Sequence, residues 1–369
     1  MKKFNNQKYK EYNQMMKNKK IPEAEYLTTM KNPENIIEFD NLKTYFYTDT
    51  GTVKAVDGVS FEIPRGKTIG VVGESGCGKS VTSLSVMRLL QGPQGQIAGG
   101  SIRYNQEKYN RTVDLTKLPI KEMEKIRGNE ISMIFQEPMT TLNPVFTIGN
   151  QLSECIQLHN PKMSKKDVKK RSLEVLELVG IKREGIYDNY PHELSGGMRQ
   201  RVVIAMALSC DPQLIIADEP TTALDVTIQA QILDLLRDLK DKINASIMLI
   251  THDLGVVAEM ADYVVVMYAG RVVEQGTADD IFHHPLHPYT VGLMKSRPML
   301  NEKIERLYSI PGNVPNPINL PSHCYFKNRC EFCIDTCEGE YPELVAVTET
   351  HLVSCQLCKE KKKSTGGAN

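Results

Sequence analysis

An octapeptide with the pattern G-x-x-x-x-G-K-S combines residue types that bind phosphate. It follows a short apolar run over residues 68–72 and precedes a helical pattern, which is the context that this motif requires. Its glycines let backbone N–H groups turn toward an anion, Lys79 can reach the β- and γ-phosphates, and Ser80 can ligate Mg²⁺. We interpret the thiol of Cys77 as a spectator. The residues expected to bind the nucleotide are Gly73, Glu74, Ser75, Gly76, Cys77, Gly78, Lys79, Ser80 and Val81.

Two adjacent acids end a second apolar run. Asp218 and Glu219 follow a strand predicted over Leu214–Ala217. One carboxylate suffices for the metal, so we expect Asp218 to hold Mg²⁺ through water, while Glu219 acts as general base on the water that attacks the γ-phosphate. Solvated acids at a sheet edge are a poorer explanation, because the phosphate-binding motif lies upstream.

A third segment is a loop that becomes a helix, Leu194-Ser195-Gly196-Gly197-Met198-Arg199-Gln200-Arg201. Ser195 supplies a hydroxyl, the two glycines let N–H groups approach an anion, and the following helix adds its positive dipole end. This combination predicts a phosphate sensor. Standing alone, it would be better explained as an ordinary turn that caps a helix.

These three motifs, in this order, resemble those of ATP-binding cassette (ABC) proteins, and the resemblance covers about Ile36 to Gly276. The resemblance implies that Gln136 senses Mg²⁺ and the γ-phosphate, so that the metal ligands would be Ser80, Gln136 and Asp218. It also implies that His252 is the switch histidine. The expected catalytic residues are therefore Glu219, His252 and Gln136.

The same resemblance suggests how the nucleotide is enclosed. Phe46 lies where the family places an aromatic ring against adenine, although Tyr45 and Tyr47 are near enough to compete, and a strand aromatic could equally be core. In this family two cassettes face each other head to tail, and Asp225 resembles the loop that crosses to the partner. The residues expected to complete an ATP site on the other chain are Ser195, Gly196, Gly197 and Gln200.

The order of apolar patterns predicts an α/β fold that positions these residues. Residues 35–270 should form an ABC-type P-loop ATPase core with an antiparallel β subdomain at its start and a helical subdomain inserted at about 138–209. A helix is expected over Ser164–Val179, with Ser164 at its start and Gly180 at its end. A small Cys-rich C-terminal region should span 271–358, and we interpret 1–34 and 359–369 as polar, disordered tails.

Composition restricts the setting of the protein. Lys and Arg number 45 and Asp and Glu also number 45, so the absence of net charge argues against broad nucleic-acid binding. Apolar stretches such as Val264–Tyr268 are far shorter than the roughly 20 residues that cross a bilayer, and residues 1–20 lack the apolar core of a secretion signal. We therefore expect a cytosolic chain, and the resemblance to ABC proteins implies that it lies peripherally on the cytoplasmic face of a bacterial membrane.

Flanking sequences point to one branch of the family. Residues 194–208 (LSGGMRQRVVIAMAL), 221–232 (TTALDVTIQAQI), His287-Pro288-Tyr289-Thr290 and Ile310-Pro311-Gly312 resemble the ATPases of oligopeptide and dipeptide importers. This implies a heterodimer with a companion ATPase, two transmembrane permeases and an extracellular peptide-binding protein. A related nickel importer is an alternative. Non-transport ABC proteins are disfavoured, because the sequence has neither a second cassette nor a long coiled coil between Lys79 and Asp218. A catalytically dead module is disfavoured because Lys79, Asp218, Glu219 and His252 are all present.

Six of the nine cysteines lie between Cys324 and Cys358. In a reducing compartment such a cluster suggests a metal centre before disulfides. Cys324, Cys330, Cys337 and Cys355 resemble a C-terminal motif that binds a [4Fe–4S] cluster in some peptide-importer ATPases. Cys333 and Cys358 are additional and create two C-x-x-C pairs close to zinc-ribbon spacing, so zinc and unligated buried thiols remain alternatives.

Overall fold

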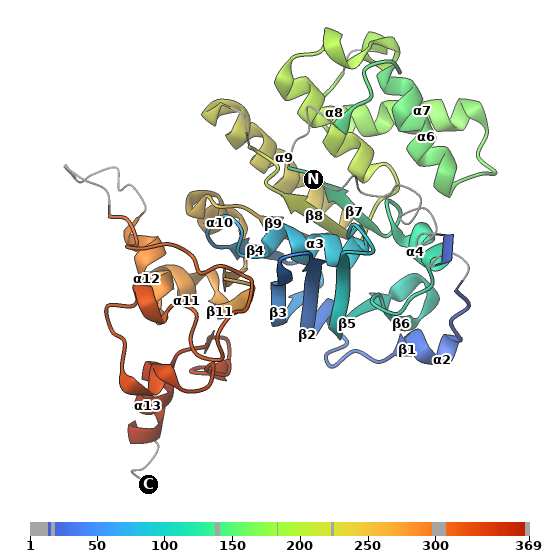
Figure 1. Ribbon diagram of the computed structural model, residues 1–369. Helices are drawn as coiled ribbons and strands as arrows, with labels where there is room; N and C mark the ends of the chain where they lie inside the picture. The colour runs from blue at the N-terminus through green and yellow to red at the C-terminus, as the bar shows by residue number, and fades with distance from the viewer. Residues whose placement is uncertain are drawn as a thin grey trace.

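The structure is a computed structural model that describes residues 14–15, 19–136, 141–182, 184–222, 225–296 and 308–365. Two β-sheets form the centre, a group of helices stands at one end, and the C-terminal region covers another side (Figure 1). This agrees with the predicted α/β class. None of the helices in these ranges is long and apolar enough to span a membrane. Residues 1–13, 16–18 and 366–369 of the predicted tails, and 138–140 of the predicted helical insertion, lie outside the description.

The larger sheet, as far as the described residues go, has the order β12-β13-β11-β10-β4-β9-β8-β7. Its parallel strands are β4 (Thr68–Val72), β7 (Ile131–Ile134), β8 (Leu214–Asp218), β9 (Ser246–Ile250) and β10 (Tyr263–Tyr268). All residues of β4, β8 and β9 are buried, as expected for short apolar strands covered on both faces. Because parallel strands end at the same edge, the loops after β4, β7, β8 and β9 are brought to one edge of this sheet.

The second sheet is antiparallel, with the order β1-β6-β5-β2-β3 among the described strands. The predicted antiparallel β subdomain is present, since β2 and β3 run antiparallel and pair Ile37 with Ile63 and Phe39 with Phe61. The rings of Phe39 and Phe61 stack with centroids 4.2 Å apart, and they share one apolar cluster with Ile69 of β4. This cluster joins the two sheets. The strands are β1 (Leu27–Thr28), β2 (Asn35–Thr48), β3 (Gly51–Pro64), β5 (Gly95–Gln106) and β6 (Arg111–Asp114).

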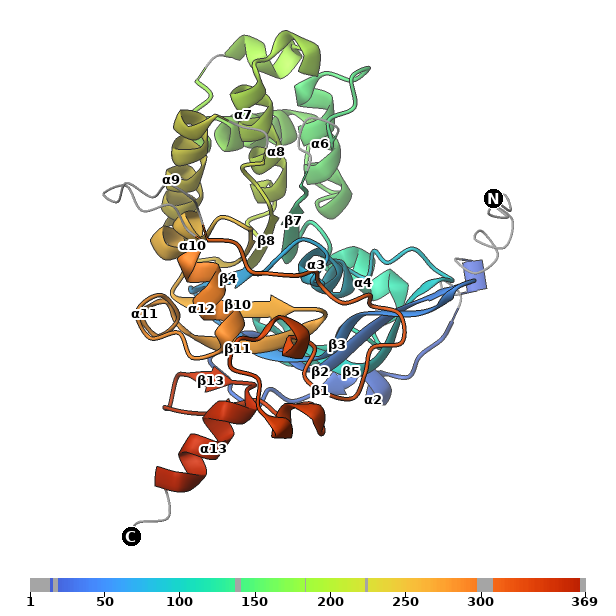
Figure 2. The same ribbon diagram turned by 60° about the vertical axis from the view of Figure 1, so that its left-hand side comes forward.

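The helical subdomain stands beyond the β7 and β8 end of the larger sheet (Figure 2). Its main helices are α6 (Ile148–His159), α7 (Lys165–Leu178) and α8 (Gly196–Leu208). The helix predicted over Ser164–Val179 is confirmed as α7, which begins where Ser164 Oγ accepts the Asp167 N–H at 3.2 Å. The remaining helices of the core are α3 (Lys79–Met87), α4 (Ile120–Ile126), α9 (Val226–Ile243) and α10 (Leu254–Met260).

The C-terminal region extends the larger sheet. Strand β11 (Arg271–Thr277) pairs with β10, so the predicted boundary at 270 falls in a hairpin turn and β11 belongs to the sheet of the ATPase core. The following elements are α11 (Ala278–His283), α12 (Pro288–Lys295), β12 (Val345–Ala346), β13 (Leu352–Val353) and α13 (Gln356–Thr365). Strand β13 pairs with β11.

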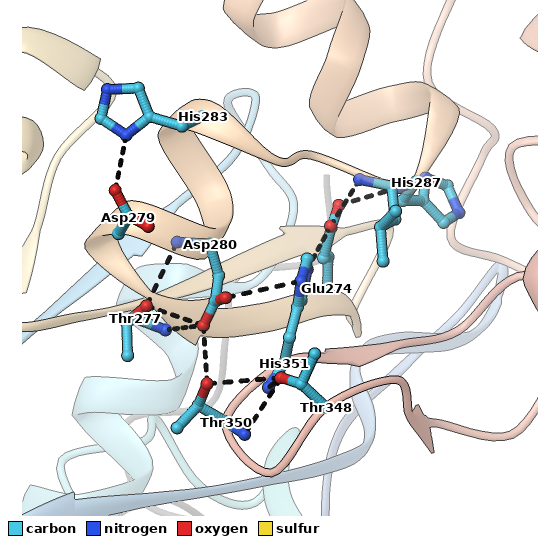
Figure 3. Close-up of polar contacts among 10 residues, drawn as sticks. Glu274, Thr277, Asp279, Asp280, His283, His287, Thr348, Thr350 and His351 are labelled. Carbon is cyan, nitrogen blue, oxygen red and sulfur yellow. Dashed lines mark hydrogen bonds and ion pairs between the residues drawn. The ribbon is translucent and has the colours of Figure 1, made fainter.

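A buried contact between a histidine and a glutamate fastens the β12–β13 hairpin to the core (Figure 3). His351 Nε2 lies 2.7 Å from Glu274 Oε1, with both side chains almost fully buried. The Glu274 carboxylate also accepts the N–H groups of Leu286 at 2.7 Å and His287 at 2.9 Å. One buried carboxylate therefore ties β11, the start of α12 and the β13 hairpin together.

Both predicted tails are shorter than expected. Residues Glu23–Tyr26 form α2, and β1 pairs with β6 through Leu27 and Val113. The side chain of Tyr26 is buried in the main core, which anchors this segment. At the other end, residues 359–365 continue helix α13. The extents assigned to disorder, 1–34 and 359–369, were therefore wrong where the chain is described.

Candidate active site

The phosphate-binding loop lies between β4 and α3. At Gly73 φ is +148° and at Gly78 it is +101°, and a Cβ atom at these positions would lie 2.1 Å from the Met267 carbonyl oxygen and 2.3 Å from that of Ala55. Only glycine fits there. Lys79 is buried, and its ammonium donates to the carbonyls of Gly73 at 2.7 Å and Glu74 at 3.1 Å. The loop thus curls around a cation.

Cys77 and Val81 occupy less direct positions. The Cys77 side chain is buried, and burial raises the pKa of its thiol, so the thiol is neutral at neutral pH. Val81 lies in the first turn of α3. Ser75 and Gly76, in contrast, are exposed at the tip of the loop.

The predicted metal ligands Ser80 and Asp218 lie together. The Ser80 hydroxyl donates to Asp218 Oδ1 at 3.0 Å, and the Ser83 hydroxyl lies 3.5 Å from Asp218 Oδ2. Burial raises the pKa of Asp218, and the neighbouring charge of Glu219 acts in the same direction. A hydroxyl and a carboxylate are hard oxygen donors of the kind that Mg²⁺ prefers, so these residues fit that ion.

Glu219 is the point where the other predicted residues meet. Gln136 Nε2 donates to Glu219 Oε2 at 3.0 Å, and His252 Nδ1 lies 3.2 Å from Oε1. The Thr222 hydroxyl donates to Oε2 at 2.9 Å, a contact that the sequence analysis missed although a threonine three residues into the following turn could have suggested it. Burial opposes ionisation of Glu219, but the hydrogen bonds from His252 and Thr222 outweigh it and lower its pKa.

The signature residues Ser195, Gly196 and Gly197 start helix α8, on the helical subdomain. Ser195 is exposed, and its hydroxyl oxygen accepts the Met198 N–H at 3.4 Å as the N-cap. A Cβ atom at Gly196 would have no heavy atom within 4 Å, so the backbone there is open to another molecule. The segment therefore lies on the helical subdomain, whereas the loop before α3 lies on the larger sheet (Figure 1).

The expectation for Gln200 requires correction. Its side chain is fully buried, and Nε2 donates to the carbonyl of Pro220 at 2.5 Å. A fully buried amide does not reach a nucleotide held by another chain. Gln200 therefore links helix α8 to the segment after Glu219, and its predicted direct contact with ATP is wrong in this conformation.

Asp225 and the aromatic candidates lie at the surface of the core. Asp225 is exposed and caps α9, where its Oδ1 accepts the Ile228 N–H at 2.9 Å. Phe46 is half-buried on β2 and pairs with Gly95 of β5. Tyr45 is committed elsewhere, because its hydroxyl donates to Asp57 at 2.5 Å, whereas Tyr47 is exposed.

The cysteines of the C-terminal region gather in space but not as a ready ligand set. Cys324 interacts electrostatically with Cys330, Cys337 and Cys355, and the thiol of Cys358 lowers the pKa of Cys355 by hydrogen bonding. Yet nowhere in the described ranges do three His, Cys, Asp or Glu side chains lie so that they could hold a metal ion. The arrangement leaves both the iron–sulfur and the zinc hypotheses as predictions.

Comparison with known proteins relates this chain to ABC transporters. The family described as "ABC transporter" matches residues 56–222, and the family "Oligopeptide/dipeptide transporter, C-terminal region" matches residues 273–337. The oligopeptide transport ATP-binding protein AppD of Bacillus subtilis is 54% identical over 327 residues, covering 88% of this chain and 98% of that protein. The dipeptide transport ATP-binding protein DppD of the same organism is 50% identical over 325 residues, covering 88% and 95%.

Solved structures share the core. The dimeric ATP-binding cassette MJ0796 bound to ADP and Pi has a TM-score of 0.57 and 26% sequence identity, covering 66% of this chain and 98% of that one. The cbiO1 protein from Clostridium perfringens, part of the ABC transporter complex cbiONQ, has a TM-score of 0.56 at 27% identity, covering 68% and 92%.

Proposed function

Because this chain belongs to the ATP-binding proteins of the oligopeptide and dipeptide ABC transporters, we propose that it hydrolyses ATP to power peptide import through membrane permeases. The observation that carries the proposal is the convergence of Gln136, Thr222 and His252 on Glu219, next to the Ser80–Asp218 pair. A phosphate-binding loop, two oxygen ligands for a metal and a hydrogen-bonded carboxylate are the parts that phosphoryl transfer to water needs.

The nucleotide enters a loop that already surrounds a cation. Lys79 exchanges its carbonyl partners on Gly73 and Glu74 for the β- and γ-phosphates. Ser80 and Asp218 are the residues that would hold Mg²⁺. The bound ion supplies positive charge that offsets the charge developing on the phosphates. Burial makes the Asp218 carboxylate costly to ionise, and a bound cation removes that cost.

Glu219 takes the proton of the attacking water. The water oxygen forms a bond to the γ-phosphorus, the bond to the β–γ bridging oxygen breaks, and ADP and phosphate leave. The lowered pKa of Glu219 keeps it ionised at neutral pH, so that it is ready to accept the proton. His252 and Gln136 orient that carboxylate and report the state of the γ-phosphate.

Ser195, Gly196 and Gly197 complete an ATP site on a second cassette. The exposed hydroxyl, the open space at Gly196 and the start of α8 give this segment free N–H groups and a positive helix end. The dimeric form of the related cassette MJ0796 supports the arrangement. We infer a companion ATPase as the second cassette, with Asp225 at the junction and Phe46 against the adenine ring.

The helical subdomain offers a docking face for a permease. Val145, Phe146 and Leu158 are 71%, 51% and 73% exposed, which is unusual for large apolar side chains. Phe146 and Leu158 line a groove of about 640 Å³ together with Asn150, Gln151, Ser153, Glu154 and Gln157. Docking of the two transmembrane permeases here would place the chain peripherally on the cytoplasmic face of a bacterial membrane.

Transport by the reconstituted assembly tests the function. The chain, its companion ATPase, the permeases and the extracellular binding protein would be placed in proteoliposomes with Mg-ATP. ATP-dependent uptake of labelled di- to pentapeptides is expected, and Lys79→Ala should abolish it. Uptake of Ni²⁺ with no peptide uptake would instead favour the nickel importer.

For the C-terminal cysteines we propose a [4Fe–4S] cluster on Cys324, Cys330, Cys337 and Cys355. Their mutual proximity supports it, and four thiolates suffice, although the side chains must turn toward one another to bind it. Anaerobically purified full-length protein should then be brown and contain iron and sulfide. Colourless protein with stoichiometric zinc would favour a zinc site that includes Cys333 and Cys358, and protein without metal would indicate unligated thiols.

A further inference from the structure

The phosphate-binding loop is held from outside by the C-terminal region. Glu74, the second residue of the loop, receives a bidentate contact from Arg329, whose Nη1 donates to Oε2 at 2.7 Å and whose Nη2 donates to Oε1 at 3.0 Å. The backbone N–H of Glu74 donates to the Tyr289 hydroxyl at 2.8 Å. Both partners lie more than 200 residues further along the chain.

Arg329 is itself locked in place. Its side chain is only 4% exposed, and Nε donates to the Pro311 carbonyl at 2.8 Å. It also contacts the Tyr268 hydroxyl at 3.3 Å and lies 5.8 Å from the ring centre of Phe326. Because the buried, planar guanidinium of Arg329 has this many partners, its orientation is fixed, and the Glu74 carboxylate that it binds is fixed as well.

Tyr289 is equally fixed. Its side chain is fully buried, and it lies in the first turn of α12. His287, the N-cap of that helix, is bound through its backbone N–H to the Glu274 carboxylate, which His351 pairs with from the β13 hairpin (Figure 3). A continuous chain of buried contacts therefore runs from the C-terminal hairpin to the loop.

We propose that Arg329 and Tyr289 are positioning residues for the phosphate-binding loop, through which the C-terminal region sets the affinity for ATP. They hold Glu74 so that the later N–H groups of the loop and Lys79 remain aimed at the phosphates. The inference rests on the proposed binding of phosphate by residues 73–80.

Charge gives the contact a second effect. The Glu74 carboxylate belongs to the loop that receives a highly anionic ligand, and an unpaired carboxylate there would repel the phosphates. Arg329 is the cation that offsets this charge, and its own side chain is 4% exposed against 30% for Glu74, so salt reaches the arginine side of the pair poorly. Loss of Arg329 should therefore harm binding more than loss of both partners together.

The test compares four variants of the full-length chain by titration with a fluorescent ATP analogue and Mg²⁺. Arg329→Met should weaken binding about tenfold, which corresponds to about 1.4 kcal/mol, and Arg329→Met/Glu74→Gln should recover most of that loss. Tyr289→Phe should weaken binding by a smaller factor. Lys327→Met is the matched control, because Lys327 pairs with Glu338 at the surface of the same segment, and it should bind as the wild type.

In the assembled transporter Arg329→Met should raise KM for ATP more than it lowers kcat. Wild-type affinity in Arg329→Met, or no recovery in the double variant with an unchanged melting temperature, would overturn the inference. Lys79→Ala distinguishes a failure of the positioning role from a failure of the proposed phosphate site. If Lys79→Ala binds ATP normally, the proposed phosphate site fails; if it does not bind and Arg329→Met does, only the positioning role fails.

Discussion

Glu219 has a left-handed backbone conformation and a carboxylate that three side chains hydrogen-bond. Its φ of +48° lies in the left-handed region, which costs a non-glycine residue about 1 kcal/mol. Three side chains hydrogen-bond its two oxygens and offset that cost, while the N–H of Glu219 donates to the Ile250 carbonyl at 2.8 Å. The carboxylate is thereby held at the ends of β8 and β9, beside the metal ligands.

Glu219→Gln should separate binding from chemistry. The amide keeps the shape of the side chain but cannot take a proton, so ATP should still bind and trap the closed dimer while turnover falls about 10²–10⁴-fold. Steady-state ATPase assays and nucleotide-binding measurements on the same preparation check this. Thr222→Val is the matched comparison, since it removes one contact to the same carboxylate and should cost far less. Turnover at the wild-type rate in Glu219→Gln would remove this residue from the role of base.

At the scale of single elements, helix α12 depends on a neutral histidine. Nδ1 of His287 accepts the Tyr289 N–H at 3.0 Å, which requires an unprotonated nitrogen. Burial lowers the pKa of His287 from 6.5 to about 4, against an opposing effect of Glu274. The helix that carries Tyr289 is thus capped by a group that acid would charge.

Stability should consequently fall on mild acidification. Between about pH 6.5 and pH 4 the unfolded chain binds a proton at this residue that the folded chain does not, so the free energy of unfolding decreases as pH drops through that window. For His287 alone the loss from pH 7 to pH 5 is about 2 kcal/mol. Urea unfolding at both pH values measures it, with His287→Asn as a capping residue that does not titrate. An equal pH dependence in wild type and His287→Asn would contradict the assignment.

At the scale of the whole molecule, the C-terminal region is built into the ATPase. Strand β11 continues the larger sheet, the Glu274–His351 pair closes the hairpin over it, and Arg329 reaches the phosphate-binding loop. The region therefore contributes to the core rather than hanging from it. Its removal should therefore disturb the ATP site, in addition to removing the clustered cysteines.

The buried pair and a surface pair of the same chemistry can be compared directly (Figure 3). His351→Ala removes the side-chain partner of the buried Glu274 carboxylate, which keeps only the N–H groups of Leu286 and His287, and should cost about 3 kcal/mol. His283→Ala breaks a contact with Asp279 in which the two side chains are 70% and 76% exposed, and it should cost less than about 1 kcal/mol. Denaturant unfolding of both variants measures the difference. Similar losses of unfolding free energy in the two variants would show that the Glu274–His351 contact does not stabilise the fold more than a surface contact does.

The proposed head-to-tail assembly leads to a second prediction at this scale. Ser195→Arg should block the ATP site shared with the companion while leaving nucleotide binding at this chain's own Lys79 intact, because the arginine enters the opposite face. The measurement is the nucleotide occupancy of each of the two ATP sites in the mixed dimer, with a labelled nucleotide on one cassette. Glu177→Arg, on the exposed side of α7, controls for an added arginine on the helical subdomain. Loss of binding at the chain's own loop would contradict a site formed in trans.

Local patterns were enough to find the chemistry. Lys79, Ser80, Asp218 and Glu219 are recognisable in sequence because phosphate binding and metal ligation need particular residue types at fixed spacing beside a strand. The buried strand β4 and the helix α7 were equally readable, since burial and capping act over a few residues. The burial of Gln200 was not, because its partner Pro220 lies on another element.

The sequence by itself determined the fold class, the ATP-binding motifs and the importer family, since each depends on residues close together in the chain. Only the tertiary structure decided that Gln136, Thr222 and His252 meet at Glu219, and that Arg329 and Tyr289 hold Glu74. These contacts join segments up to 255 residues apart, and their partners are set by how sheets and helices pack. Spacing along the chain carries no record of such packing.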